Sequence, residues 1–216
     1  MRNDLRKSEL YRAPLGRERE EGYWLYIVFA FLIFFALFFR VWWTSNYGGV
    51  VVDGSSMYKT LVSGEKLLMR YVEDGEGIER GDVIVVYVGD YEECSSISGG
   101  FLIKRLIAIE GDKVKCQDGQ ISICYAGSNE YVPLDESYAY YTNPSIYDFQ
   151  GQEYVVGEGE IFFLGDNRNN SCDSRYKEWG GSHLQGKLYK ATDVYGVVPE
   201  WAMKYSDKLE KIFFQK

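Results

Sequence analysis

The sequence predicts a mainly β, antiparallel domain that follows one N-terminal transmembrane helix. Residues 23–39 form an uncharged run that is dominated by Phe, Ile and Leu. After it, the apolar runs are short, rich in β-branched and aromatic residues, and bounded by Gly, Asp or Ser. The chain also contains 23 glycines, and no long stretch has the 3.6-residue periodicity of a helix. These observations together favour a β-rich fold over a helical one.

The apolar run has the length of a membrane span. A helix over residues 23–43 would be about 31 Å long at ~1.5 Å per residue, close to the ~30 Å of a bilayer core. Aromatic residues stand at both ends, as membrane interfaces favour, and Arg40 lies close enough to one end to snorkel. A cleaved signal peptide would have a shorter apolar region and small residues after it, whereas Trp42 and Trp43 follow here. We therefore expect a retained single-pass anchor.

The distribution of basic residues predicts the orientation of this anchor. Six Lys and Arg residues lie within residues 1–22, and none lies within residues 44–58. By the positive-inside rule, residues 1–22 form a cytoplasmic tail and residues 44–216 an extracytoplasmic domain at the cell membrane. This outer domain retains 17 of the 24 basic and 27 of the 32 acidic residues, a net charge of −10. Such a charge argues against nucleic acid as a partner.

The strands of the outer domain are predicted from runs of β-formers between turn residues. The expected surface loop is Gly89–Gly100, and the tyrosine-rich segment Tyr125–Gly159 is expected to be an insertion or flap. We expect strands at Gly49–Val52, Lys66–Tyr71, Val83–Val88, Phe101–Ile109, Lys113–Lys115, Ile121–Cys124, Glu160–Leu164 and Val194–Val198.

The cysteines leave the disulfide pairing open. An extracytoplasmic domain permits disulfides, and Asp118-Gly119 predicts a two-residue hairpin turn. That turn would pair Cys116 with Ile121, so Cys116 and Cys124 would not face each other. Without a C-x-x-C pair and with one histidine, His183, we expect neither a metal site nor a cofactor. The four cysteines are Cys94, Cys116, Cys124 and Cys172.

Scarcity of histidine also bears on catalysis, because a serine nucleophile would need another base. Ser56 is a candidate nucleophile that follows Gly54 shortly after the anchor. Ser55 is an equally plausible nucleophile on local grounds. Either residue could instead be a serine with only a structural role in a turn. Lys104 lies within Phe101–Ile109, on the strand face of Leu102, Leu106 and Ala108. Burial on an apolar face would lower the pKa of this lysine, whereas a lysine at a strand end would snorkel to solvent. A neutral lysine is the main alternative to imidazole as a base.

A third segment, Gly165–Arg175, is a glycine-bounded polar loop with alternating charges. A solvated loop would have the same composition. Alternatively, Ser171 would hydrogen-bond the amine of the lysine and hold it toward the serine, while Asp173 and Arg175 would pair and fix the loop. Arg105 points to the face opposite Lys104 and is expected to be structural.

These segments resemble the successive sequence boxes of bacterial type I signal peptidases. Their order and spacing and the preceding anchor all agree with that family, and Gly54 and the single anchor resemble its Gram-positive branch. The similarity runs from the anchor to about residue 200. The matching segments are Ser56–Leu61, Gly81–Ile84, Lys104-Arg105 with Gly111-Asp112, and Gly165–Arg168 through Ser174-Arg175.

The resemblance implies a membrane-bound serine endopeptidase with a serine–lysine dyad. It implies Ser56 as nucleophile, Lys104 as general base and Ser171 as the hydrogen-bond partner of Lys104. It further implies an oxyanion bound by the serine's own N–H, a β-rich fold with a hydrophobic surface on the bilayer, and the secretion machinery as a neighbour. The implied substrates are signal peptides with small residues at the first and third positions before the cut.

Two departures from the family and three rival interpretations remain. Lys59 and Glu110 stand where the family usually has proline. Lys59 also completes an S-x-x-K motif, as in penicillin-binding proteins, but the S-D-N and K-T-G motifs of those proteins are missing. A self-cleaving repressor would not need the anchor. A catalytically weak relative that assists assembly of surface proteins is disfavoured because Ser56 and Lys104 are both present.

Overall fold

The computed structural model of the protein describes residues 18–89, 98–142, 153–175 and 188–214. The predicted tail through residue 17, the loop that holds Cys94, and His183 lie outside these residues. The chain divides between Ser45 and Asn46 into two compact units.

The first unit contains one long apolar helix, α1 (Glu18–Asn46). Its segment Gly22–Asn46 is 25 residues long and apolar enough to cross a membrane. None of the apolar window in this segment is buried inside the protein. An all-round apolar surface is typical of a helix that faces lipid, and the helix extends the predicted span at both ends.

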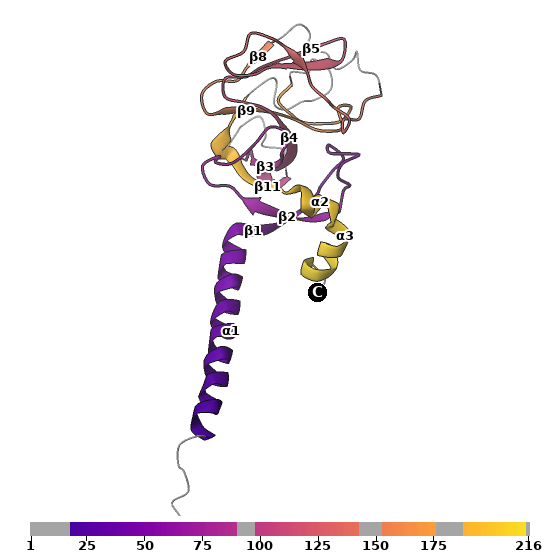
Figure 1. The fold of residues 1–216 in the computed structure, drawn as a ribbon. Helices are drawn as coiled ribbons and strands as arrows, with labels where there is room; N and C mark the ends of the chain where they lie inside the picture. The colour runs from indigo at the N-terminus through magenta and orange to yellow at the C-terminus, as the bar shows by residue number, and fades with distance from the viewer. Residues whose placement is uncertain (1–17, 90–97, 143–152, 176–187, 215–216) are drawn as a thin grey trace, which may run out of the picture. The chain divides into compact units, whose positions relative to one another are not determined.

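The second unit is mainly β, as predicted, and contains two antiparallel sheets (Figure 1). In the larger sheet the strand order is β1-β2-β11-β3-β4-β9-β10, and in the smaller it is β7-β6-β5-β8. The strands are β1 (Tyr47–Val51), β2 (Lys66–Tyr71), β3 (Val83–Tyr87), β4 (Phe101–Ile109), β5 (Lys113–Gln117), β6 (Gln120–Cys124), β7 (Val132–Pro133), β8 (Glu153–Val155), β9 (Glu160–Leu164), β10 (Tyr189–Lys190) and β11 (Val194–Val198).

The predicted strands all exist, and four of them have the predicted bounds. The segment expected to be an insertion or flap instead contributes β7 and β8 to the smaller sheet. These strands and β10 are only two or three residues long. Strands this short have no alternating sequence pattern from which they could be predicted. Asp118 and Gly119 turn the β5–β6 hairpin with φ of 51° and 79°. The hairpin pairs Cys116 with Ile121, which confirms that Cys116 and Cys124 do not face each other.

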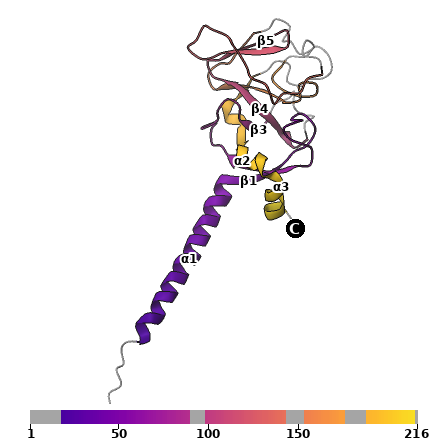
Figure 2. The same cartoon turned by 45° about the vertical axis from the view of Figure 1, so that its right-hand side comes forward.

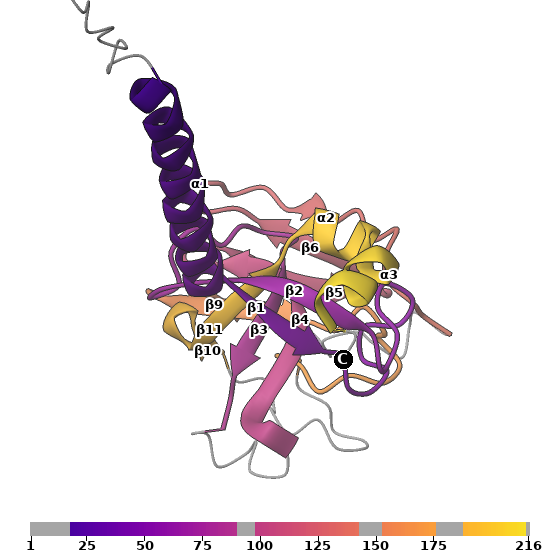
Figure 3. The same cartoon turned by 90° about the horizontal axis from the view of Figure 1, so that it is seen from below.

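Short helical segments that the sequence did not predict follow β11. These are α2 (Glu200–Lys204), α3 (Ser206–Leu209) and a π-helical turn, η5 (Glu210–Phe214); two 3₁₀ turns, η2 (Ser98–Gly100) and η4 (Ala191–Asp193), occur earlier. The C-terminal segments lie beside β1 and β2 (Figures 2 and 3). Phe214 packs against Gly49, and its ring would lie 2.7 Å from a Cβ added there, so a larger residue would require the ring to shift.

The turn that joins the two sheets is fixed by Asp112, which is fully buried. Its carboxylate accepts two hydrogen bonds from the guanidinium of Arg80, at 2.7 and 2.8 Å. It also accepts the backbone N–H groups of Ile109 and Ala126, each at 3.0 Å. One buried side chain therefore satisfies donors from three separate segments.

We predict that Asp112→Ala lowers the free energy of unfolding by about 3–5 kcal/mol, because the variant leaves buried donors and a cation without their acceptor. Chemical denaturation of the full chain in detergent measures this loss. Glu130 is exposed, so Glu130→Ala should stay within about 0.5 kcal/mol of the unmodified protein. Equal stabilities of the two variants would contradict the role given to Asp112.

Candidate active site

Ser56 lies in a tight turn after β1. The turn begins at Gly54, whose φ of 86° suits glycine. It is closed by hydrogen bonds from Tyr58 N to Ser55 O at 3.1 Å and from Leu61 N to Met57 O at 2.8 Å. Met57 is buried, so the turn is anchored in the core next to the serine. Ser56 is half-buried, whereas Ser55 is exposed.

Lys104 reaches this turn from β4. The residue pairs with Ile84 of β3 and is only 1% exposed. Its amine donates hydrogen bonds to Ser56 Oγ at 2.7 Å and to the carbonyl oxygen of Ile103 at 2.9 Å. Burial lowers the pKa of Lys104 to about 8, although the carboxylates of Asp173 and Asp166 act in the opposite direction. A lysine with this pKa is partly neutral near pH 8 and can then accept a proton.

The environment of Lys104 differs from the expected strand face in one respect. Leu106 and Leu102 belong to the hydrophobic core on the side of Ile84, as expected. Ala108 instead packs in the second core, with Val114 and Phe162. The reason is a register shift between Leu106 and Ala108 in the pairing of β4 with β9, which rotates the end of the strand.

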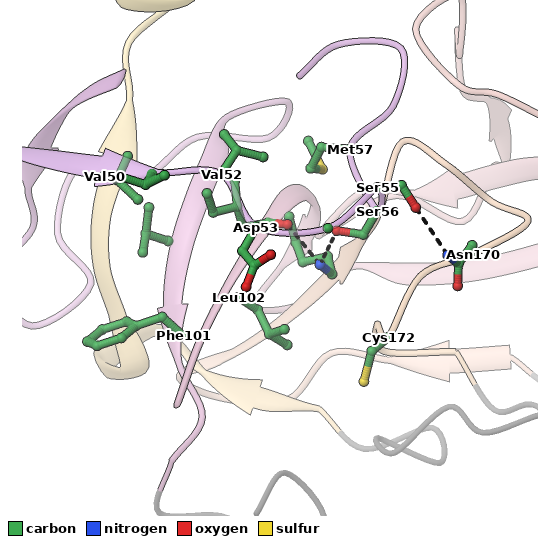
Figure 4. A pocket seen from close by; sticks show the side chains of 15 residues that line it. Val50, Val52, Asp53, Ser55, Ser56, Met57, Phe101, Leu102, Asn170 and Cys172 are labelled. Carbon is green, nitrogen blue, oxygen red and sulfur yellow. Dashed lines mark hydrogen bonds between the residues drawn. The ribbon is translucent and has the colours of Figure 1, made fainter. Parts of the chain in front are cut away.

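The loop Gly165–Arg175 holds the serine turn through asparagines that sequence reasoning did not select. Asn167 N donates to Ser56 O at 2.9 Å, and Asn167 Nδ2 donates to Ser55 O at 3.0 Å. Asn170 Nδ2 donates to Ser55 Oγ at 3.1 Å (Figure 4). Asparagines are common in polar loops, so only the fold reveals that these two face the turn.

Asp173 and Arg175 form a buried ion pair inside the same loop. The guanidinium donates to both carboxylate oxygens, each at 2.8 Å. Gly165 N donates to Asp173 at 3.1 Å. Burial raises the pKa of Asp173, but the charge and hydrogen bonds of Arg175, together with the Gly165 N–H and the Ser171 hydroxyl, outweigh burial and hold that pKa at about 2. The carboxylate is therefore ionised at neutral pH and fixes the loop behind Lys104.

Arg105 forms a second buried pair, with Asp166. Two of its nitrogens donate to the carboxylate at 2.8 and 2.6 Å, and a third donates to the carbonyl oxygen of Gly81 at 2.7 Å. The ring of Tyr138 lies 4.1 Å from the guanidinium carbon. Arg105 thus connects the Gly81–Ile84 box to the Gly165–Arg175 loop.

Ser171 is buried beside the serine turn. A Cβ added to Gly165 would lie 2.1 Å from Ser171 Oγ and 2.6 Å from Ser56 O, so glycine is required for this close approach. The expected hydrogen bond from Ser171 to Lys104 is not formed. The hydroxyl of Ser171 instead lies close enough to the carboxylate of Asp173 to help lower its pKa, and the carbonyl oxygen of Ile103 receives the second N–H of Lys104.

The two residues at the usual proline positions have local partners. Lys59 is exposed, and its amine lies 5.0 Å from the ring centroid of Tyr140, a cation–π contact. Its amine therefore faces Tyr140, and among the described residues it makes no hydrogen bond to Ser56. Glu110 Oε2 accepts a hydrogen bond from Gly159 N at 2.9 Å.

A pocket of about 290 Å³ opens beside Ser56 and Lys104. Figure 4 shows Ser56 and Asn170 at one end and Phe101 and Val50 at the other. Most of its lining comes from residues 50–57 and from residues 101–104 of β4, and the rest from Val85, Asn170 and Cys172. Apart from Asp53 and Lys104 the lining carries no charge. Among the described residues no cluster of His, Cys, Asp and Glu is arranged to hold a metal ion.

Comparison with known proteins gives related sequences and related solved structures. Signal peptidase I U of Bacillus subtilis (strain 168) is 34% identical over 60% of this chain and 65% of its own length. Probable signal peptidase I-2 of Synechocystis is 32% identical over 72% of this chain and 66% of its own length. A signal peptidase I structure from Enterococcus faecalis V583 is 23% identical, covers 57% of this chain and 98% of its own, and has a TM-score of 0.38.

The chain spans slightly less than two thirds of the length of these two curated relatives. The family model "Signal peptidase, peptidase S26" matches residues 22–199, which include the apolar helix and every box described above. The chain therefore belongs to the signal peptidase family, peptidase S26.

Proposed function

We propose that this protein is a serine endopeptidase that removes N-terminal signal peptides from exported preproteins, with Ser56 as nucleophile and Lys104 as general base. One observation carries the proposal: a fully buried lysine, with a pKa lowered to about 8, lies 2.7 Å from the hydroxyl of a serine at the edge of a pocket. Membership of the signal peptidase family supports the substrate class.

The proposed reaction has two steps and returns the protein to its starting state. Neutral Lys104 accepts the hydroxyl proton as Ser56 Oγ attacks the scissile carbonyl carbon. The resulting ammonium donates that proton to the nitrogen of the leaving peptide as the C–N bond breaks, and an acyl-enzyme remains. Water then attacks the ester carbonyl carbon as Lys104 accepts its proton, and the ammonium returns that proton to Ser56 Oγ as the C–O bond breaks and the carboxylic acid product leaves.

Backbone geometry at Ser56 supports stabilisation of the oxyanion. Within the described residues the N–H of Ser56 donates to no protein acceptor. A donor that is fixed in place and unused in the resting state is what a developing oxyanion requires. Asn167 and Asn170 hold the turn that carries this N–H, so we include them with Asp173, Arg175 and Arg105 as positioning residues.

We assign Ser171 a role only after proton transfer. A neutral lysine amine has two N–H groups and one lone pair, and the ammonium has three N–H groups. Ile103 O accepts one of them and Ser56 Oγ another. The buried hydroxyl of Ser171 can donate its own proton to Asp173 and still accept a hydrogen bond, so it is a suitable acceptor for the third N–H of the ammonium.

The pocket supports an extended peptide as substrate. Chain segments line it on either side, and its apolar residues, among them Val50, Val52 and Leu102, suit the small apolar side chains of the substrate. The apolar helix supports a single membrane anchor, and the distribution of basic residues supports a cytoplasmic location for residues 1–22 and an extracytoplasmic one for residues 44–216. In that arrangement the partners are the bilayer, the preproteins and the secretion machinery that delivers them.

We predict that Ser56→Ala abolishes cleavage of a preprotein, a loss of about 10⁴-fold or more, because the nucleophile is removed. Ser55→Ala is the matched control, since it loses only the contact with Asn170 and should keep activity within about tenfold. Cleavage by purified protein in detergent is followed by mass spectrometry of the products. Normal turnover by Ser56→Ala would refute the proposal, and cleavage by neither variant nor parent would favour the assembly factor.

We predict that kcat/KM rises about tenfold per pH unit below pH 8 and levels off above it, because only neutral Lys104 accepts the serine proton. Lys104→Ala should lose on the order of 10²–10⁴ in rate or more. Lys104→Arg should fail as well, since guanidinium stays protonated. Lys59→Ala should keep most activity. If instead Lys59→Ala were inactive and Lys104→Ala active, the S-x-x-K interpretation would replace the dyad.

We predict that a reporter enzyme that is active only outside the cytoplasm will be active when it is fused after Lys216. The six basic residues before the anchor and the absence of any in residues 44–58 give this orientation. The same reporter on a known exported protein provides the positive control. A fusion that is well expressed but inactive would reverse the proposed topology.

A further inference from the structure

A stripe of four aromatic rings crosses the larger sheet beside the candidate pocket. The ring centroids of Tyr71 and Tyr195 lie 5.4 Å apart, those of Tyr195 and Phe101 5.3 Å, and those of Phe101 and Tyr87 5.0 Å. Three of these side chains are well exposed: Tyr195 at 46%, Phe101 at 42% and Tyr87 at 37%. We call these four residues the aromatic stripe. Contiguous exposed aromatic surface of this kind marks an interaction site.

The aromatic stripe is continuous with the pocket, because Phe101 belongs to both. Figure 4 shows Phe101 at the end of the pocket away from Ser56. Phe101 precedes Lys104 by three residues in β4, so the two residues lie about 10 Å apart along the strand at ~3.3 Å per residue. An extended peptide that lies along β4 would therefore leave the pocket at Phe101 after about three residues.

The sequence pattern of signal peptides fits this spacing. Such a peptide has an apolar run that is followed by a small-residue motif of the Ala-x-Ala type just before the cut. The three residues of the motif would occupy the pocket between Ser56 and Phe101. Residues further upstream, at the end of the apolar run, would then reach Phe101, Tyr195 and Tyr71.

We propose that the aromatic stripe binds the apolar segment of the signal peptide, immediately upstream of the small-residue motif. This inference rests on the proposed function. The stripe itself carries no basic residue, and the outer domain has a net charge of −10. A stripe without basic residues adds no attraction to anionic headgroups, whereas its aromatic rings suit an uncharged apolar peptide. The aromatic stripe is continuous with the pocket, which also favours the peptide substrate as the molecule that binds the stripe.

The test uses the full chain in detergent micelles and two peptides that share one Ala-x-Ala motif and differ upstream of it. One has leucines at the fourth to sixth residues before the cut, and the other has serines. The unmodified protein should show a KM about tenfold lower for the leucine peptide. Tyr195→Ser should raise the KM of the leucine peptide by about that factor, so that the two KM values become nearly equal.

Tyr125→Ser is the matched control. Tyr125, which follows β6, is 40% exposed and packs its ring against Arg80 rather than against the aromatic stripe. Replacing it should therefore leave the ratio of the two KM values unchanged. An unaltered ratio in Tyr195→Ser would overturn the inference. So would an effect that occurs only in proteoliposomes, which would make the bilayer the occupant. Equal KM values in the unmodified protein would overturn this inference alone, whereas cleavage of neither peptide would overturn the proposed function with it.

A second measurement does not depend on turnover. A benzophenone side chain at the fifth residue before the cut, in a peptide bound to the Ser56→Ala protein, should crosslink to the aromatic stripe. Mass spectrometry locates the crosslinked residues. Crosslinks confined to other surfaces, such as the smaller sheet, would contradict the binding site.

Discussion

The burial of Lys104 against Ser56 is the constraint on which the rest of the site depends. Lowering the pKa of this amine from 10.5 to about 8 corresponds to about 3 kcal/mol of unfavourable free energy for the charged form. The unfolded chain binds the proton of Lys104 more tightly than the folded protein does, so the charged amine destabilises the folded protein below pH 8. This destabilisation is relieved as the pH rises from about 8 to 10.5. The fold must supply that free energy elsewhere, and the two hydrophobic cores around β4 are the largest source.

Two buried ion pairs keep the surroundings of this lysine fixed without restoring its charge. Asp166 and Asp173 each raise the pKa of Lys104, but by less than burial lowers it. Each carboxylate also faces a guanidinium, Arg105 or Arg175, in a bidentate pair. Arg105 joins three segments that are distant in sequence, because it bonds both Asp166 and the carbonyl oxygen of Gly81, whereas the Asp173–Arg175 pair fixes the loop from within. The same two ion pairs therefore set both the position of Lys104 and the charges that act on its pKa.

The sequence predicted those parts of the structure that follow from local pattern. Strands such as Phe101–Ile109 and the Asp118-Gly119 hairpin have clear periodicity or turn chemistry, and their bounds or register agree with prediction. Other features depend on contacts between distant segments. The bulge that moves Ala108 to the second core, the contacts of Asn167 and Asn170 with the serine turn, and the packing of Phe214 on Gly49 leave no local signature. Arg105 was expected on the face opposite Lys104, but its partner Asp166 became evident only in three dimensions.

The protonation state of Lys104 is the central claim, and nitrogen NMR of the lysine side chains measures it directly. The full chain in detergent, labelled with ¹⁵Nζ-lysine, would be titrated between pH 6 and pH 11, and Lys104 would be assigned by the loss of its signal in Lys104→Arg. We predict a midpoint near pH 8 for this resonance. A midpoint at the ordinary lysine value of about 10.4 would contradict the account, because the amine would then be charged whenever the serine must lose its proton.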